Sequence, residues 1–268
     1  MRFRILGPLE VQTRQDWTAI GASKWRAVLA CLLLNAGQIV STDTLIDELW
    51  GNDPPAKAAN LISIYVLRLR RLIGDTEGRV LVTRAPGYQL RLDDGDLDAE
   101  RFGALMNQGR QALTAGDPER AAMLLADSLS LWRGRALADV PLSAFVAAEA
   151  GRLAELRLAA TELRIEADLA CGRHRLVIPE LRRLLADQQL KEELWLLLMR
   201  ALDGAGRRAE ALGAYEQARN VIADQLGVDP GREMQQLFQQ LLSADVRPAE
   251  KKREPTASRR RTQVPASP

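Results

Sequence analysis

Hydrophobic side chains recur every three or four positions between Ala58 and Ile73, the spacing that places them on one face of an α-helix. The opposite face of this expected helix is basic at its edges and holds two aliphatic side chains. Its residues are Lys57, Asn60, Ser63, Ile64, Leu67, Arg68, Arg70 and Arg71. No aspartate or glutamate occurs from 54 to 74, so nothing within the segment neutralises this face. Alone, the pattern is as typical of a solvated basic face as of a functional one.

The segments before this helix predict a small sheet and two further helices. Alternating apolar positions in residues 3–11 predict two short strands, and a third strand is expected near 17–20. Two helices follow. Ser23 is expected to cap the first, and the second is expected to run from Thr42 to Trp50. The sequence GNDPP at 51–55 then breaks the helical pattern before the basic helix begins.

A β-hairpin is predicted after the basic helix. Residues 80–82 and 88–92 alternate between apolar and polar types, and the turn between them carries Arg84. A small sheet, three helices and a hairpin, in this order, form a winged helix with an added N-terminal sheet. In such folds the third helix enters the DNA major groove, while the hairpin, called the wing, reaches the adjacent groove or backbone. The basic helix and the arginine-tipped hairpin together therefore favour DNA binding over a solvated face.

Each part of this expected DNA surface has its own chemistry. The arginines of the third helix divide between guanine edges and phosphates, whereas Ile64 and Leu67 either meet thymine methyl groups or pack on the wing or on another subunit. The N-termini of the first two helices offer backbone N–H groups to phosphates. Lys24 and Arg26 add charge at the first of these helix ends, and Ser41 and Thr42 lie at the second.

From Asp98 onward the pattern is helical throughout. Three turns of similar form contain Gly116, Gly172 and Gly206, and the last two glycines are 34 positions apart. This period is that of tetratricopeptide repeats, although an insertion interrupts it after the first turn. A degenerate helical-repeat domain is therefore expected. Such a domain serves either as packing or to bind a protein or another copy of the chain.

The charge is distributed unevenly along the chain, which has a formal net charge of +2. Residues 1–95 have 12 basic and 10 acidic side chains, residues 96–246 have 18 and 23, and residues 247–268 have 7 and 2. A polyanionic partner must therefore be met by local patches rather than by bulk charge. The segment 245–268 is rich in proline and charge, and we expect it to be a disordered basic tail or linker.

Catalytic chemistry is not expected. The chain has one histidine, His174, and lacks the glycine-rich nucleotide loops, the GxSxG motif and the CxxC pairs that mark common enzyme and metal sites. We therefore expect a protein that is not an enzyme and needs no metal or cofactor. Cys31 and Cys171 are far apart and are expected to be buried free thiols. Without a signal peptide or an apolar run long enough to cross a bilayer, a cytoplasmic location is expected.

The motifs in this chain resemble those of the Streptomyces antibiotic regulatory protein (SARP) family of transcriptional activators. They are FRILGPLEV, KWRAVLACLLLNAGQIVSTDTLIDELWG, IYVLRLRRLIG, the wing sequence RAPGYQL, and GRRAEALGAYEQARNVIADQLGVDPG. The resemblance covers about residues 1–244. It implies an OmpR-like α+β winged helix-turn-helix at 1–95, followed at 96–244 by an all-α, tetratricopeptide-like bacterial transcriptional activation domain. The chain is then either a small member or the N-terminal part of a larger regulator.

The resemblance also implies partners and site residues. It implies a homodimer on the direct repeats of a promoter, recruitment of RNA polymerase through its sigma subunit or flap, and control of an antibiotic or secondary-metabolite gene cluster. The expected DNA-binding residues are Lys24, Arg26, Ser41, Thr42, Asn60, Ser63, Ile64, Arg68, Arg70, Arg71, Thr83 and Arg84. The expected polymerase-contacting residues are Asn52, Asp53, Pro54, Pro55 and Lys57. Leu67 departs from the polar residue found there in many relatives.

Two other functions are consistent with the same residues. One is a protein-interaction scaffold whose winged helix is a dimerisation module, although a scaffold does not require the acid-free face at 54–74. The other is a repressor that uses the same DNA contacts but blocks polymerase. Only the family resemblance favours activation over repression.

Overall fold

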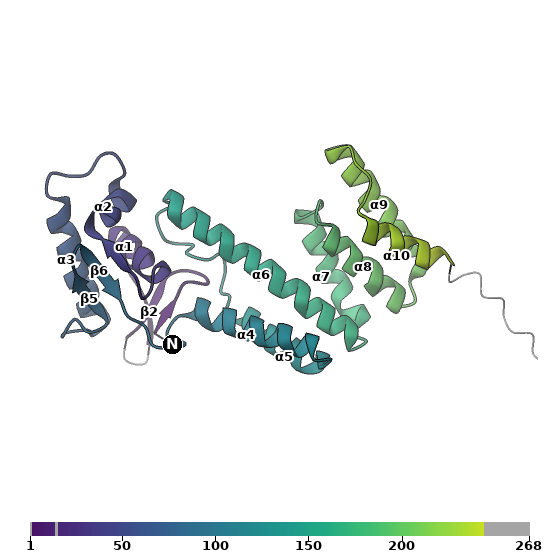
Figure 1. The fold of residues 1–268 in the computed structure, drawn as a ribbon, viewed down its shortest axis with the longest axis horizontal. Helices are drawn as coiled ribbons and strands as arrows, with labels where there is room; N and C mark the ends of the chain where they lie inside the picture. Colours follow the sequence, from purple (N-terminus) through teal and green to yellow (C-terminus); the bar gives the residue numbers. More distant parts are fainter. Residues whose placement is uncertain (1, 14–15, 244–268) are drawn as a thin grey trace, which may run out of the picture.

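Two small antiparallel sheets and three helices form the N-terminal head of the computed structural model, which describes residues 2–13 and 16–243 (Figure 1). The first sheet has the strand order β1-β2-β3, and the second has the order β4-β6-β5. The elements are β1 (Phe3–Arg4), β2 (Glu10–Thr13), β3 (Asp16–Ala19), α1 (Ser23–Leu34), β4 (Ile39–Ser41), α2 (Thr42–Trp50), α3 (Ala58–Leu72), β5 (Leu81–Arg84) and β6 (Gly87–Leu90). This order confirms the expected winged helix with an added N-terminal sheet.

Two local expectations need correction. Ser23 is the first residue of α1 rather than its cap, because the preceding Ala22 has the extended backbone of an N-cap residue and no side chain caps the helix. The segment after α1 is a strand, β4, which is missing from the elements expected between the first two helices. It is a strand because it pairs with β6 of the wing, with Val40 opposite Tyr88. By contrast, Ser41 caps α2 as expected by accepting a hydrogen bond from the N–H of Thr44 at 2.9 Å.

Seven helices follow in the described part of the chain. They are α4 (Asp98–Thr114), α5 (Pro118–Ser130), α6 (Ala144–Ala170), α7 (His174–Asp187), α8 (Glu192–Gly204), α9 (Arg208–Leu226) and α10 (Arg232–Ser243). Gly116, Gly172 and Gly206 form the turns of three helix pairs, with φ of 78°, 75° and 77°. This left-handed conformation strongly favours glycine, which explains why the three turns look alike in the sequence. The helical-repeat expectation is confirmed.

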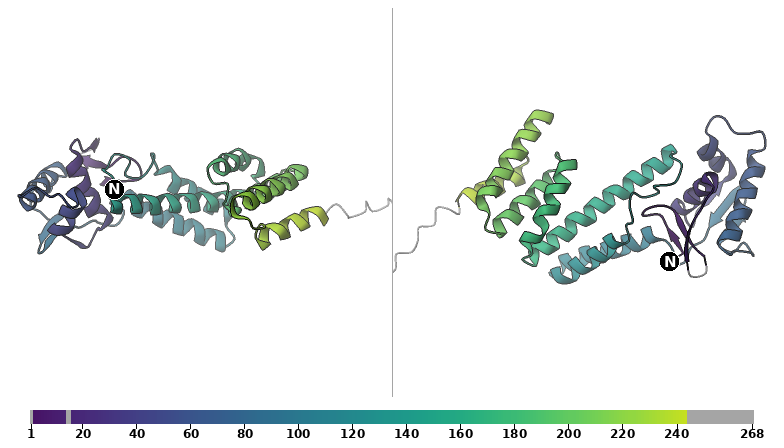
Figure 2. Two further views of the ribbon diagram at one scale, coloured as in Figure 1. Left: turned by 90° about the horizontal axis from the view of Figure 1, so that it is seen from above. Right: turned by 180° about the vertical axis from the view of Figure 1, so that it is seen from behind.

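The molecule is elongated, with the winged-helix head at one end and α7–α10 at the other (Figures 1 and 2). The long helix α6 runs from the head toward the far helices, and α4 and α5 lie alongside it. Two main cores fit this shape. The head core continues into the helical part through Phe102, Trp132 and Val146, and a separate core fills α7–α10 around Met199.

A network of buried hydrogen bonds joins the head to the helical part. Asp98, the first residue of α4, is 1% exposed and accepts hydrogen bonds from the N–H groups of Ile5 and Leu6 at 2.8 and 3.0 Å. Burial raises the pKa of Asp98, although these donors and Arg133, 3.7 Å away, oppose the shift. The N–H of Leu9 donates to Asp139 at 2.7 Å. We call this group of contacts the junction, and it fixes the head on the helical part.

The junction bears on two other expectations. The expected domain boundary at 95 stays a prediction, and the junction crosses it because Asp98 bonds the turn between β1 and β2. The expected tail at 245–268 lies outside the described residues. Both cysteines are free, as expected, but Cys171 is only half-buried whereas Cys31 is buried. No helix among the described residues is long and apolar enough to cross a membrane.

Candidate nucleic-acid interface

Helix α3 divides into a buried face and an exposed basic face, as its sequence predicts. Ala58, Ile62, Val66 and Leu69 are buried against the head core, where α3 packs on α1 and α2. The exposed face carries Asn60, Ser63, Ile64, Leu67, Arg68 and Arg71. Arg70 and Arg71 lie in the last turn, where cations also stabilise a helix through its dipole. Burial of the apolar face thus turns the arginines toward solvent.

The two aliphatic side chains on the exposed face are only partly covered within the chain. Ile64 and Leu67 are 49% and 47% exposed. About half of each side chain is therefore accessible to a partner. Their contact with DNA, with another subunit or with the wing stays a prediction.

The wing is fastened to the C-terminal half of α3 by Arg70. Its guanidinium donates from Nε to the carbonyl of Leu81 at 2.8 Å and from a terminal nitrogen to Oγ1 of Thr83 at 2.9 Å. Both acceptors lie on β5, so Arg70 crosses from the helix to the hairpin. This geometry gives Arg70 and Thr83 a positioning role between α3 and the wing.

Asp75 is a second fastener between α3 and the wing. Its buried carboxylate accepts hydrogen bonds from the N–H groups of Arg79, Val80 and Leu81 at 2.8, 3.2 and 2.8 Å. Burial alone would raise the pKa of Asp75, but these three donors and the nearby Arg70 lower it on balance. The ionised carboxylate therefore organises the turn that leads into β5.

Replacing this carboxylate is expected to weaken the head in a pH-dependent way. Asp75→Asn should cost about 1.5–3 kcal/mol near pH 7, the range for hydrogen bonds to charged groups. Because folding lowers the pKa of Asp75, its contribution is fully present above the unfolded pKa of about 4 and is lost as the pH falls through the folded pKa. Urea unfolding at a series of pH values measures the difference between wild type and variant, which should shrink in acid.

The exposed Asp53→Asn is the matched control and should leave the unfolding free energy unchanged. A difference between wild type and Asp75→Asn that stayed constant from neutral pH to about pH 3 would contradict an ionised Asp75.

The other side of the wing is held by β4 and the start of α2. Gly87 lies so close to β4 that a Cβ there would sit 1.9 Å from the carbonyl oxygen of Val40. The N–H of Thr42 donates to the carbonyl of Pro86 at 3.2 Å, and the hydroxyl oxygens of Tyr88 and Ser63 lie 3.2 Å apart. The wing is therefore fixed on both sides and presents its tip at a set place beside α3.

The structure separates the sequence-predicted DNA residues into two groups. Lys24 bonds the carbonyl of Leu49, Arg26 bonds Asp139, and Ser41, Thr42 and Arg70 bond the head as described above. Ser63 also bonds within the chain. In the second group, the side chains of Asn60, Arg68, Arg71 and Arg84 are exposed and make no hydrogen bond or ion pair with any described residue. The three arginines of this group are the charged side chains left available to a partner.

The expected polymerase-contacting residues form an exposed loop. All residues from 51 to 57, between α2 and α3, are exposed. The loop projects from the top of the head in the view of Figure 1, above α2 and α3. It is therefore accessible to a second protein without rearrangement of the head.

Sequence reasoning missed three positioning residues of this surface, Asp75, Gly87 and Tyr88. A weak signal was present for Asp75, because it follows Gly74 at the helix end and precedes a strand. No sequence signal indicated the contact of Gly87 with Val40, which depends on a long-range pairing. No group of three potential metal ligands occurs within the described ranges.

Two family models match the chain and together cover most of it. "Transcriptional regulatory protein, C terminal" matches residues 20–90, and "Bacterial transcriptional activator domain" matches residues 97–242. DnrI of Streptomyces peucetius is 37% identical over 253 residues, which cover 91% of this chain and 93% of DnrI. EmbR of Mycobacterium tuberculosis is 37% identical over 259 residues, which cover 96% of this chain and 67% of EmbR.

The chain also matches part of a longer protein and a solved structure. AfsR of Streptomyces coelicolor is 39% identical over the whole chain, but the chain spans only 27% of the length of AfsR. The structure of Mycobacterium tuberculosis EmbR in complex with a low-affinity phosphopeptide has a TM-score of 0.87 and 37% identity, covering 91% of this chain and 65% of that one. The similarity thus extends to both the head and the helical part.

Proposed function

Because the chain belongs to the SARP family of transcriptional regulators, we propose that it activates transcription by binding promoter DNA through α3 and the wing. The observation that carries this proposal is the group of unpartnered arginines, Arg68 and Arg71 on α3 and Arg84 at the wing tip. They lie on two elements that Arg70 and Asp75 fasten together. Such an arrangement suits a double helix, whose adjacent grooves require two probes at a set distance.

Within this proposal the residues have different tasks. Arg68 and Arg71 contact guanine edges or phosphates in the major groove, and Arg84 reaches the neighbouring backbone or minor groove. Asn60, Ile64 and Leu67 complete the surface that faces the bases. Lys24, Arg26, Ser41 and Thr42 support the first two helices, whose N-terminal N–H groups remain candidates for phosphate contacts.

The proposal extends to partners. The exposed loop at 51–57 and the acidic helical part contact RNA polymerase, at its sigma subunit or flap. Two copies of the chain bind direct repeats of the promoter, and the regulated genes form an antibiotic or secondary-metabolite cluster. The similarity to DnrI and AfsR, which are regulatory proteins of Streptomyces, supports this part of the proposal.

Removing two of the free arginines tests the DNA contact. A duplex is first selected from random sequences with the full chain, and fluorescence anisotropy then compares it with a scrambled duplex across a salt series. Arg68→Ala combined with Arg71→Ala should weaken binding by about tenfold or more, since one bidentate arginine–guanine pair supplies about 1–3 kcal/mol. Each lost phosphate contact should also lower the salt slope by about one.

The control variant carries Arg175→Ala and Arg183→Ala on α7, which remove the same charge from exposed positions far from the head. It should bind as the wild type does. Unchanged binding by the α3 variant, or equal binding to both duplexes by the wild type, would reject the proposal in favour of the scaffold function. Transcription in vitro with purified polymerase then separates the remaining functions, because an activator raises the transcript and a repressor lowers it.

A further inference from the structure

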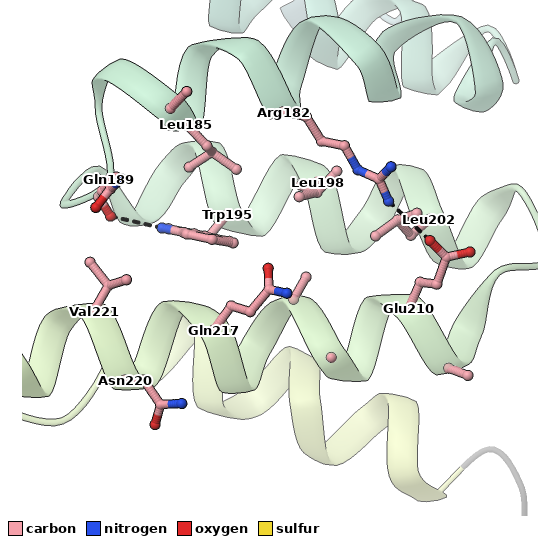
Figure 3. A pocket seen from close by; sticks show the side chains of 14 residues that line it. Arg182, Leu185, Gln189, Trp195, Leu198, Leu202, Glu210, Gln217, Asn220 and Val221 are labelled. Carbon is pink, nitrogen blue, oxygen red and sulfur yellow. Dashed lines mark hydrogen bonds and ion pairs between the residues drawn. The ribbon is translucent and has the colours of Figure 1, made fainter.

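A groove in the helical part, far from the head, is not used by the proposed DNA contacts. It encloses about 800 Å³ between α7 and α9, with α8 as its floor (Figure 3). It forms because α7 and α9 each pack mainly on α8 rather than on one another. A volume of this size lies in the range of small-molecule sites in proteins, which is about 300–1,000 Å³.

The floor of the groove is apolar. Trp195, Leu198 and Leu202 of α8 line it, and they are only 6%, 4% and 1% exposed. The Nε1–H of Trp195 donates to the carbonyl of Gln189 at 2.9 Å, which holds the indole ring at one end. An apolar floor in a groove of this volume suits the rings of a small molecule.

The wall of the groove formed by α9 has a position without a side chain, because the residue there is a glycine. Gly213 of α9 lines the groove, and a Cβ built on it meets no atom within 4 Å. Gln217, one turn further along α9, points toward the groove and offers a polar contact on the same wall (Figure 3). The space beside Gly213 is therefore not filled by other side chains and can hold part of a ligand.

The end opposite Trp195 has an excess of positive charge. Arg182 of α7 donates to Glu210 of α9 at 2.9 Å, and Arg207 donates to the same carboxylate twice at 2.7 Å. Two guanidinium groups thus share one carboxylate, whose pKa the hydrogen bonds from Arg207 lower, so Glu210 is ionised at neutral pH. The side chain of Arg182 is 53% exposed and has further N–H groups to donate.

We propose that this groove binds an aromatic small molecule that carries one anionic group, such as a carboxylate or a phenolate. The rings lie over the leucines and the edge of Trp195, and the anionic group takes the free donors of Arg182. The inference stands apart from the proposed DNA contact, because none of the residues involved belongs to the head. It adds a small-molecule site to the helical domain, for which the repeat pattern indicates either packing or protein binding.

Two fluorescent probes that differ only in charge provide the test on the full chain. Anilinonaphthalene sulfonate has aromatic rings and one anionic group, whereas N-phenylnaphthylamine has the same rings without the sulfonate. We expect both probes to bind with a saturable, one-to-one signal and to quench tryptophan fluorescence. Gly213→Leu, which fills the groove, should weaken both by about tenfold or more, since the leucine occupies the space of an apolar ring.

The charge contact has its own variant. Arg182→Gln should weaken the sulfonate probe by about tenfold, the effect of losing one hydrogen bond between charged groups, and leave the neutral probe unchanged. The matched control is Gly151→Leu, the same substitution at an exposed position of α6 where a Cβ also meets nothing within 4 Å. It should bind both probes as the wild type does, and thermal unfolding should show that all variants are folded.

Three results would overturn the proposal. The first is binding of the probes that does not saturate, and the second is binding that survives Gly213→Leu. The third is an equal effect of Arg182→Gln on the charged and the neutral probe. Because no DNA is present, failure of this test leaves the proposed function untouched, and failure of the DNA test leaves the groove untouched.

Discussion

Replacing Asp98 by alanine is expected to destabilise the chain by about 3–5 kcal/mol. The substitution leaves the buried N–H groups of Ile5 and Leu6 without acceptors, and each unsatisfied buried group costs about 1–3 kcal/mol. It also removes a negative partner from Arg133. Differential scanning calorimetry measures the effect, and a loss of this size should lower the Tm by about 6–20 °C for a chain of this length.

The control for this prediction is Asp94→Ala, four residues away and exposed. It should change the unfolding free energy by no more than about 0.5 kcal/mol. Equal stabilities of Asp98→Ala and the wild type would mean that the junction does not hold the head. Two separate unfolding transitions in the variant, where the wild type has one, would instead show that Asp98 makes the two parts unfold together.

Gly87→Ala is expected to disrupt the wing at a cost of about 3–4 kcal/mol, above the usual range for an overpacked core because backbone atoms are in the way. The new Cβ would lie 1.9 Å from the carbonyl oxygen of Val40 and 2.7 Å from Cα of Ser41. Relief requires β6 to leave β4, which removes the register between Val40 and Tyr88. Hydrogen exchange of the β6 amides should accelerate, and binding to the selected duplex should weaken.

Gly103→Ala provides the comparison, because a Cβ at Gly103 in α4 meets no atom within 4 Å. This variant should be stabilised by about 0.5–1 kcal/mol, the usual gain for alanine over glycine inside a helix. If Gly87→Ala were as stable as the wild type and bound DNA equally well, the close approach of β6 to β4 would be wrong.

Features that depend on local sequence were predicted well. The buried and exposed faces of α3 follow from the helical spacing of its apolar residues, and Ser41 caps α2 as its position indicates. The three turn glycines need positive φ, so they mark the helix pairs directly. In each case the signal and the structure lie within a few residues of each other.

Features that depend on distant pairings were missed. The sequence around Ile39 and Val40 is too short to indicate a strand, and its partner β6 lies almost fifty residues further along. The role of Asp98 depends on the N–H groups of Ile5 and Leu6, more than ninety residues earlier. Arg70 looked like another groove arginine, because its bonds to β5 cannot be read from the charge pattern of α3.

The junction would make the direction of the helical part depend on where the chain binds along a promoter. Helix α6 has 27 residues and is therefore about 40 Å long, at 1.5 Å per residue. Because the junction fixes the head on the helical part, on the proposed DNA contact the base pairs bound by α3 would set the direction of this helix. Moving the binding site along the DNA would therefore rotate α7–α10 around the DNA axis, in step with the turn of the double helix. A shift of about five base pairs would carry them to the opposite side of the duplex, and a full turn of about ten would bring them back.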